Sequence, residues 1–249
     1  MKPNISEFSY GFALTSEIVK TFGLSGHGAP SFPNQVVEGK PGGGYDMKLP
    51  GLPIFVQFKL SQCLTTKNAK DSSHFGLPYY RFNIRAQKYS KQHQLLLDLE
   101  AKGKKAYYAA PRFHEPSELD DAFSGANVIA QSAFFAPSSI GALPDEKEHS
   151  VSFGMNGPPL FRSEPKEIEF SDFAAEIALL KEQLPADIVS TQTTRGLIDQ
   201  LVDTYMNRSV GIERERANRL RNLDVDRSAT EHASFIARNL FGSEIFYLS

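Results

Sequence analysis

The segment from Ile54 to Ser61 is the strongest β-strand signal in the chain. Its side chains alternate between two faces, because successive side chains of a strand point to opposite sides of a sheet. One face is apolar throughout, which favours a strand at the centre of a sheet. The other face includes Gln57 and Lys59, two residues apart. We therefore expect these two polar side chains to leave the sheet on the same side.

The pattern around this strand predicts an α/β fold with a mixed central sheet. Residues 62–73 are expected to form a loop, and residues 79–85 fit either a strand or the start of a helix. The other predicted elements of the first half are a helix at 8–22, strands at 32–38, 45–49 and 54–61, a helix at 91–102, a strand at 106–110, a helix at 117–124 and a strand at 128–135. The resulting core has the order α-β-β-β-α-β.

The second half of the chain has a different character. A proline-rich link is followed by four helical patterns. They lie near 171–184, 191–206, 211–222 and 228–241. We therefore predict an α/β domain over residues 1–155 and a helical C-terminal region over residues 156–249.

Composition limits where the protein is expected to work. Of 249 residues, 41% are hydrophobic and 22% are charged, as in soluble globular proteins. No stretch approaches the roughly 20 apolar residues that span a bilayer, and the N-terminal residues lack the apolar core of a signal peptide. The single cysteine, Cys63, excludes an intrachain disulfide and a multi-cysteine zinc site. A reducing cytoplasm without membrane attachment is the expected location.

Basic residues are concentrated in one part of the chain. Residues 59–105 carry ten basic and three acidic side chains, although the whole chain has a net charge of −2. Such a stretch is typical either of a surface that binds a polyanion or of an ordinary solvated surface. His93 opens a predicted helix, where it could hold a phosphate or cap the helix. The candidate nucleic-acid-binding residues are Arg81, Arg85, Lys88, Lys91 and His93.

A carboxylate is expected near the central strand. Asp46 follows three glycines and lies eleven residues before Gln57, on the predicted neighbouring strand. Asp46, Gln57 and Lys59 could therefore meet at one edge of the sheet. A carboxylate and an amide oxygen can hold a hard divalent cation, and a lysine can orient or deprotonate water. This combination suits metal-dependent hydrolysis of a phosphodiester.

Over roughly residues 8–110, the chain resembles the PD-(D/E)XK nuclease superfamily, which has the restriction-endonuclease-like fold. The resemblance rests on the element order and on Asp46 followed, after ten residues, by Gln57-Phe58-Lys59. It implies a Mg²⁺ or Mn²⁺ cofactor, with Asp46 as the main ligand and Lys59 as the catalytic lysine. Many members also place a glutamate on the first helix, which implies a site role for Glu17.

The sequence departs from the superfamily pattern at two positions. Gln57 stands where the family usually has an acidic residue, so the metal shell would lack one negative charge. Glu38, at the end of the first predicted strand, could compensate as a further metal ligand. Tyr45 stands where the motif has its proline.

Three functions remain open at the level of sequence. The resemblance favours a nuclease that acts on nucleic acid, DNA before RNA, in restriction, repair or phage defence. The alternative is a catalytically inactive member of the same fold that binds nucleic acid through residues 59–105. In a third interpretation, the helical half recruits a partner protein or a second copy of the chain, since residues 213–221 carry charges of both signs.

Overall fold

A computed structural model describes most of the chain and shows a mixed α/β architecture. The described residues are 1–22, 54–101, 103, 105–145, 147–163, 165–183, 191–222, 229–241 and 244–246. The strands predicted at 32–38 and 45–49 lie outside these residues, as do Glu38 and Asp46. Within the described part, no helix is long and apolar enough to cross a membrane.

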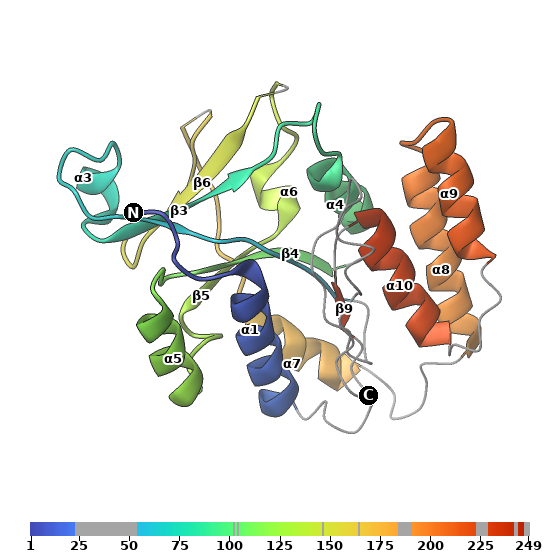
Figure 1. The fold of residues 1–249 in the computed structure, drawn as a ribbon, viewed down its shortest axis with the longest axis horizontal. Helices are drawn as coiled ribbons and strands as arrows, with labels where there is room; N and C mark the ends of the chain where they lie inside the picture. Colours follow the sequence, from blue (N-terminus) through green and yellow to red (C-terminus); the bar gives the residue numbers. More distant parts are fainter. Residues whose placement is uncertain are drawn as a thin grey trace.

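The first sheet is mixed and contains the predicted central strand. Strand β1 (Ile54–Phe58) runs parallel to β4 (Lys105–Pro111), and helix α4 (Gln92–Ala101) precedes β4. Strand β5 (Ser132–Phe135) is antiparallel to β4. On the other edge of β1, β9 (Glu244–Phe246) is antiparallel to it. Figure 1 shows this sheet at the centre of the molecule.

A second sheet, wholly antiparallel, packs beside the first. Its strands, in spatial order, are β2 (Gln62–Leu64), β3 (Tyr79–Ile84), β6 (His149–Phe153), β7 (Leu160–Phe161) and β8 (Lys166–Glu167). Strands β2 and β3 and the short helix α3 (Ser72–Phe75) are inserted between β1 and α4. The loop predicted at 62–73 instead contains β2 and the start of α3, and the undecided segment 79–85 forms β3. The sequence did not reveal these elements because short segments carry little hydrophobic periodicity.

Helices cover both faces of the first sheet. Helices α1 (Glu7–Thr21), α5 (Pro116–Ser124) and α7 (Phe173–Gln183) lie on one side of it (Figure 1). Helix α4 covers the other side together with α8 (Thr191–Met206) and α10 (Ala229–Phe241). Helix α9 (Ile212–Arg221) packs on α8, and the short helix α6 (Pro137–Ile140) packs on α4.

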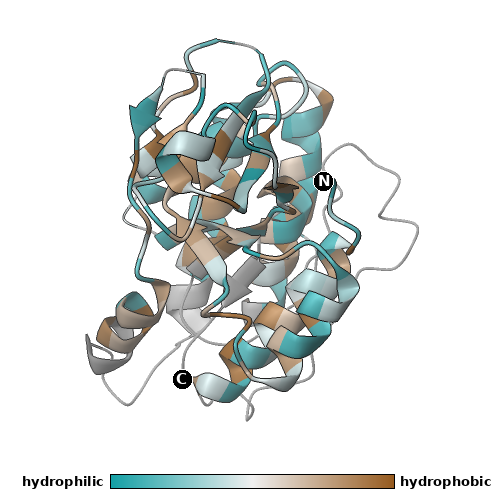
Figure 2. Ribbon diagram, turned by 90° about the vertical axis from the view of Figure 1, so that its left-hand side faces the viewer, coloured by the Kyte–Doolittle hydropathy of each residue, from teal (hydrophilic) through white to brown (hydrophobic). Residues whose placement is uncertain are grey.

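Two hydrophobic clusters form on the two faces of the first sheet. The alternation along β1 sends Phe55 into one cluster and Val56 and Phe58 into the other. Figure 2 shows hydrophobic residues gathered in the central strands and hydrophilic residues along the outer turns of the helices. Each cluster includes side chains from both sides of residue 156, such as Leu201 of α8 in the first and Phe173 of α7 in the second. The core is therefore not divided at the predicted boundary between residues 155 and 156.

Helix α1 is fixed closely on β1. Its N-cap Ser6 accepts a 2.9 Å hydrogen bond from the backbone N–H of Ser9, which starts the helix at Glu7. A Cβ atom at Gly11 would lie 3.0 Å from Cδ2 of Phe58, so glycine permits this close approach. The ring of Tyr10 also packs edge-on against Phe58, with centroids 6.0 Å apart. This packing holds the first turn of α1 near the end of β1.

Candidate functional site

Gln57 and Lys59 lie on the same side of the sheet, as their spacing predicted. Both contact Gln92, the first residue of α4. The backbone N–H of Lys59 donates to the carbonyl of Ala109 at 2.9 Å, so pairing with β4 continues one residue past β1. The position of Lys59 is therefore set by the sheet and not by a loose loop.

Gln92 connects three parts of the fold through its side-chain amide. Its Nε2 donates to Oε1 of Gln57 at 2.5 Å and to the carbonyl of Phe241, at the end of α10, at 3.3 Å. Its Oε1 accepts from Nζ of Lys59 at 3.3 Å. Gln57 is only 7% exposed, and its Nε2 donates to the carbonyl of Phe58 at 3.3 Å. The amide of Gln92 thus fixes the direction of both residues from β1.

Lys59 is partly buried and electrostatically perturbed. Its Nζ lies 5.6 Å from the ring centroid of buried Tyr108. Its pKa is lowered, mainly because the surrounding protein removes water from the ammonium group. The carboxylate of Glu7 opposes this effect, and the guanidinium of Arg85 adds to it. A lysine with a lowered pKa is more often neutral near neutral pH, and a neutral amine can accept a proton.

Glu7 and Arg85 complete this group of side chains. Glu7 begins α1 and Arg85 directly follows β3, so charges from two distant parts of the chain act on Lys59. The sequence did not single out Glu7, although Ser6 before it is a helix-capping signal. Gln92 is not marked by any local sequence pattern either. Its contact with β1 depends on the β1–α4–β4 arrangement, which local patterns do not reveal.

Glu17 is placed elsewhere in the fold. Its carboxylate accepts hydrogen bonds from the backbone N–H groups of Val128, at 2.6 Å, and Ile129, at 3.3 Å. It lies ten residues beyond Glu7, or about 15 Å along the helix axis. Glu17 therefore anchors the segment before β5, and Glu7 is the α1 carboxylate that interacts with Lys59.

The predicted phosphate role of His93 is not supported. The side chain is 2% exposed and stacks on Tyr108. Its Nε2 lies 2.8 Å from the carbonyl of Gly141 and its Nδ1 lies 2.9 Å from the hydroxyl of Tyr108. Burial lowers its pKa, and both ring nitrogens are already occupied. His93 therefore packs α4 against β4 and is not available to hold a phosphate.

The four basic candidates differ in their surroundings. Arg81 is partly buried in β3, where its Nη2 donates to Oε1 of Gln62 on β2 at 3.0 Å. Arg85, Lys88 and Lys91 are exposed and lie between β3 and α4. The exposed positive charges are therefore close in sequence to Gln92, and Arg81 is tied into the second sheet.

The described residues supply only part of a metal shell. Among them, no group of three histidine, cysteine, aspartate or glutamate side chains is placed to hold a metal ion. Around Lys59 the oxygen donors are those of Gln57, Gln92 and Glu7, and Oε1 of Gln57 already accepts from Gln92. Mg²⁺ prefers carboxylate oxygens completed by water. The donor set therefore fits a hard cation only together with the predicted carboxylate ligands outside the described residues.

No known protein family, curated protein or solved structure matches the chain.

Proposed function

We propose that the protein is a metal-dependent nuclease of the PD-(D/E)XK type that hydrolyses phosphodiester bonds, with DNA as the favoured substrate. The observation that carries the proposal is the position of Lys59. It leaves the end of a central strand beside Gln57, has a lowered pKa, and is held by Gln92 from the next crossover helix. A lysine held in this way is suited to proton transfer or to contact with a phosphate oxygen.

The order of the described elements also supports the proposal. Helix α1 packs on β1. Helix α4 leads into β4, which pairs with β1 in parallel. This arrangement agrees with the helix, strand, helix and strand expected around the motif of a restriction-endonuclease-like fold. A role in restriction, repair or phage defence is part of the same proposal and follows from the resemblance alone.

In this proposal, different residues of the chain would bind the metal ion, accept the proton and contact the phosphate. Asp46 and Gln57 would hold Mg²⁺ or Mn²⁺, with Glu38 supplying the charge that Gln57 lacks, and the bound ion would stabilise negative charge on the phosphate. The neutral amine of Lys59 would take a proton from the attacking water as its oxygen bonds to phosphorus. The bond from phosphorus to the leaving oxygen then breaks, and that oxygen takes up a proton from solvent. Arg85 would face the phosphate.

The direct test is cleavage of labelled DNA and RNA in Mg²⁺, Mn²⁺ or EDTA. We expect cleavage that needs the metal, and a loss of about 10²- to 10⁴-fold in Lys59→Ala. The matched control is Lys70→Ala, which removes an exposed lysine from the same basic stretch. Circular dichroism and urea unfolding must show that Lys59→Ala is folded. Cleavage by folded Lys59→Ala at the parent rate would exclude the catalytic role of this lysine.

One observation favours a second candidate function, a non-catalytic nucleic-acid-binding protein of the same fold. Gln57 carries no charge, and its oxygen is already engaged by Gln92. Metal affinity would then be too low for turnover. Gln57→Glu separates the two candidates, because a carboxylate can accept from Gln92 and also bind a cation. If the parent and Gln57→Glu both bind nucleic acid in a salt-dependent way and neither cleaves it, the protein is the non-catalytic nucleic-acid-binding protein.

A further inference from the structure

The segment between β3 and α4 presents an aromatic ring to solvent. Tyr89 is 75% exposed, although tyrosine usually buries most of its ring. A short turn holds it in place, since the backbone N–H groups of Tyr89 and Ser90 donate to the carbonyl of Ala86 at 2.9 and 3.1 Å. Ala86 itself is buried. The exposed ring is therefore attached to a hydrogen-bonded turn that is anchored in the core.

A positive charge lies against this ring. Nζ of Lys88 is 4.9 Å from the ring centroid of Tyr89, within the range of a cation–π contact. Among the described residues, Lys88 has no carboxylate within ion-pair distance. An aromatic face beside an unneutralised ammonium offers a stacking surface for a base and a charge for the adjoining phosphate.

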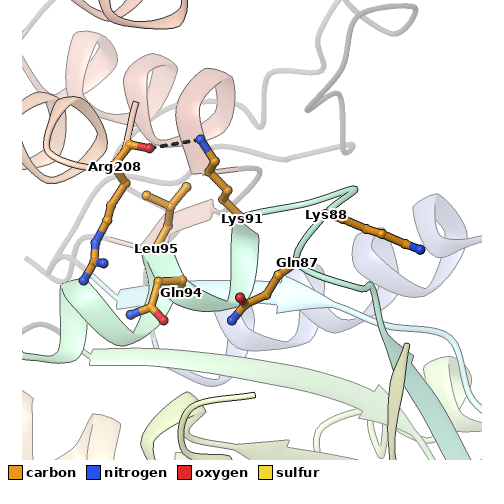
Figure 3. Close-up of a pocket in the computed structure, with 6 residues that line it drawn as sticks. All are labelled: Gln87, Lys88, Lys91, Gln94, Leu95 and Arg208. Carbon is orange, nitrogen blue, oxygen red and sulfur yellow. Dashed lines mark hydrogen bonds between the residues drawn. The ribbon is translucent and has the colours of Figure 1, made fainter. Parts of the chain in front are cut away.

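A cavity of about 410 Å³ opens next to the turn. Figure 3 shows Gln94 and Leu95 on α4, Lys91 directly before this helix, and Arg208, two residues beyond the end of α8, on the opposite side. The lining residues are Gln87, Lys88, Lys91, Gln94, Leu95 and Arg208. The lining contains three cationic side chains and no acidic one, so it suits an anionic ligand.

Nearby carboxylates neutralise part of this charge. Arg208 makes two hydrogen bonds to the carboxylate of Asp98, at 2.8 and 3.0 Å. Nζ of Lys91 donates to the backbone carbonyl of Arg208 at 3.0 Å and lies 3.6 Å from a carboxylate oxygen of Glu213. Lys88 is thus the cation most open to a ligand. Lys91 and Arg208 are held in position at the cavity by these hydrogen bonds and the ion pair.

We propose that Tyr89, Lys88 and the adjoining cavity bind a single-stranded segment of nucleic acid, with an unpaired base stacked on Tyr89 and its phosphates near Lys88 and Lys91. The proposal rests on the proposed function, because it specifies the substrate of the same site. Lys91 directly precedes Gln92, which bonds Lys59, so the strand would pass from the turn towards the candidate lysine. A single strand is required, since the faces of paired bases are covered by their neighbours in a duplex.

Binding can be measured separately from cleavage, in EDTA. The probes are a dye-labelled single-stranded DNA of about 20 nucleotides and a duplex of the same length, followed by fluorescence anisotropy. We expect the single strand to bind more tightly, and Tyr89→Ala to weaken its binding about tenfold. Tyr89→Phe should retain binding because it keeps the ring. Phe123→Ala, which removes an exposed aromatic ring from α5, is the matched control and should bind as the parent does.

Each outcome bears on one of the two proposals. Equal binding of duplex and single strand, or unchanged single-strand binding in Tyr89→Ala, would overturn the stacking site whether or not the protein cleaves. Binding of the single strand that depends on Tyr89, with no cleavage in Mg²⁺ or Mn²⁺, would retain the stacking site and reject the nuclease. If neither the single strand nor the duplex binds the parent protein, the stacking site is overturned and this surface has a different kind of ligand.

Discussion

The side-chain amide of Gln92 donates a 2.5 Å hydrogen bond to Oε1 of Gln57, and in the same position it accepts a hydrogen bond from Lys59. This relationship joins the start of α4 to the end of β1. The amide group provides a donor and an acceptor at once, whereas a carboxylate only accepts and an ammonium group only donates. Gln92 is therefore a positioning residue for the two candidate site residues of the central strand.

Replacing Gln92 should show whether it positions Lys59 and Gln57 for cleavage or contributes to substrate binding. In Gln92→Ala, Lys59 loses an acceptor and Gln57 loses a donor, so we expect the maximal cleavage rate to fall about 10- to 100-fold with little change in KM. The free energy of unfolding should fall by about 1–3 kcal/mol, because hydrogen bonds to Gln57 and to Phe241 are lost. Leu97→Ala, on the same helix but outside the cavity lining, is the control. A parallel loss of rate in Leu97→Ala would show that the effect comes from destabilised α4.

The electrostatic environment of Lys59 predicts opposite effects of its two charged neighbours. Arg85→Gln removes a repulsive cation and should raise the pKa of Lys59, whereas Glu7→Gln removes an attractive anion and should lower it. If cleavage uses the neutral amine, the pH at which the rate reaches half its maximum should move up in the first variant and down in the second. A ¹³C NMR titration of the Lys59 side chain checks both shifts independently of cleavage. Shifts in the same direction would contradict the opposite electrostatic effects of Glu7 and Arg85 on Lys59.

Glu17 should matter for stability and not for chemistry. Glu17→Ala leaves the buried N–H group of Val128 and the part-buried N–H group of Ile129 without their acceptor. Because a hydrogen bond to a charged group contributes about 1.5–3 kcal/mol, the free energy of unfolding should fall by about 2–4 kcal/mol in urea titrations. The cleavage rate per folded molecule should remain at the parent value. A rate loss of 100-fold or so in protein that stays folded would restore the site role implied by the family resemblance.

His93 should make the protein less stable in acid. Its folded-state pKa is lowered from 6.5 by burial, so the unfolded chain binds the proton more readily. The contribution of His93 to stability is therefore complete above about pH 6.5 and decreases as the pH falls towards the folded-state pKa. Urea unfolding at several pH values should show this dependence, and His93→Gln should reduce it. His232→Gln, on α10, serves as the control and should keep the acid sensitivity of the parent.

The basic side chains should contribute unequally to nucleic-acid binding. Lys88→Gln is expected to reduce the slope of log K against log salt by about 0.7 for a single strand, as expected when one phosphate contact is lost. Arg81→Gln should leave this slope unchanged, because its guanidinium is bonded to Gln62 within the second sheet. Titrations of the same labelled strand at increasing salt measure both slopes. Equal slopes in the two variants would assign Lys88 to the ordinary solvated surface.

The elements with strong local signals were predictable from the sequence alone. The helix predicted at 8–22 is α1, the helix at 91–102 is α4, and the four C-terminal helices are α7 to α10. The shared side of Gln57 and Lys59 was also predictable, because a period of two is a property of any strand. The strand predicted at 128–135 is confined to Ser132–Phe135, and strands β6 to β9 were not predicted. Most of these strands are two or three residues long and depend on pairing with distant segments.

The surroundings of the candidate lysine were decided by the tertiary structure. Gln92 bonds Lys59, and the charges of Glu7 and Arg85 act on it, from three places far apart in the sequence, so no local pattern could associate them with it. The same folding turns His93 inward and directs Glu17 to the backbone before β5. A sequence determines which side chains share a face, since that follows from the repeat of the local backbone. Which of those side chains lose water, and which charges lie near them, depends on how helices and sheets pack.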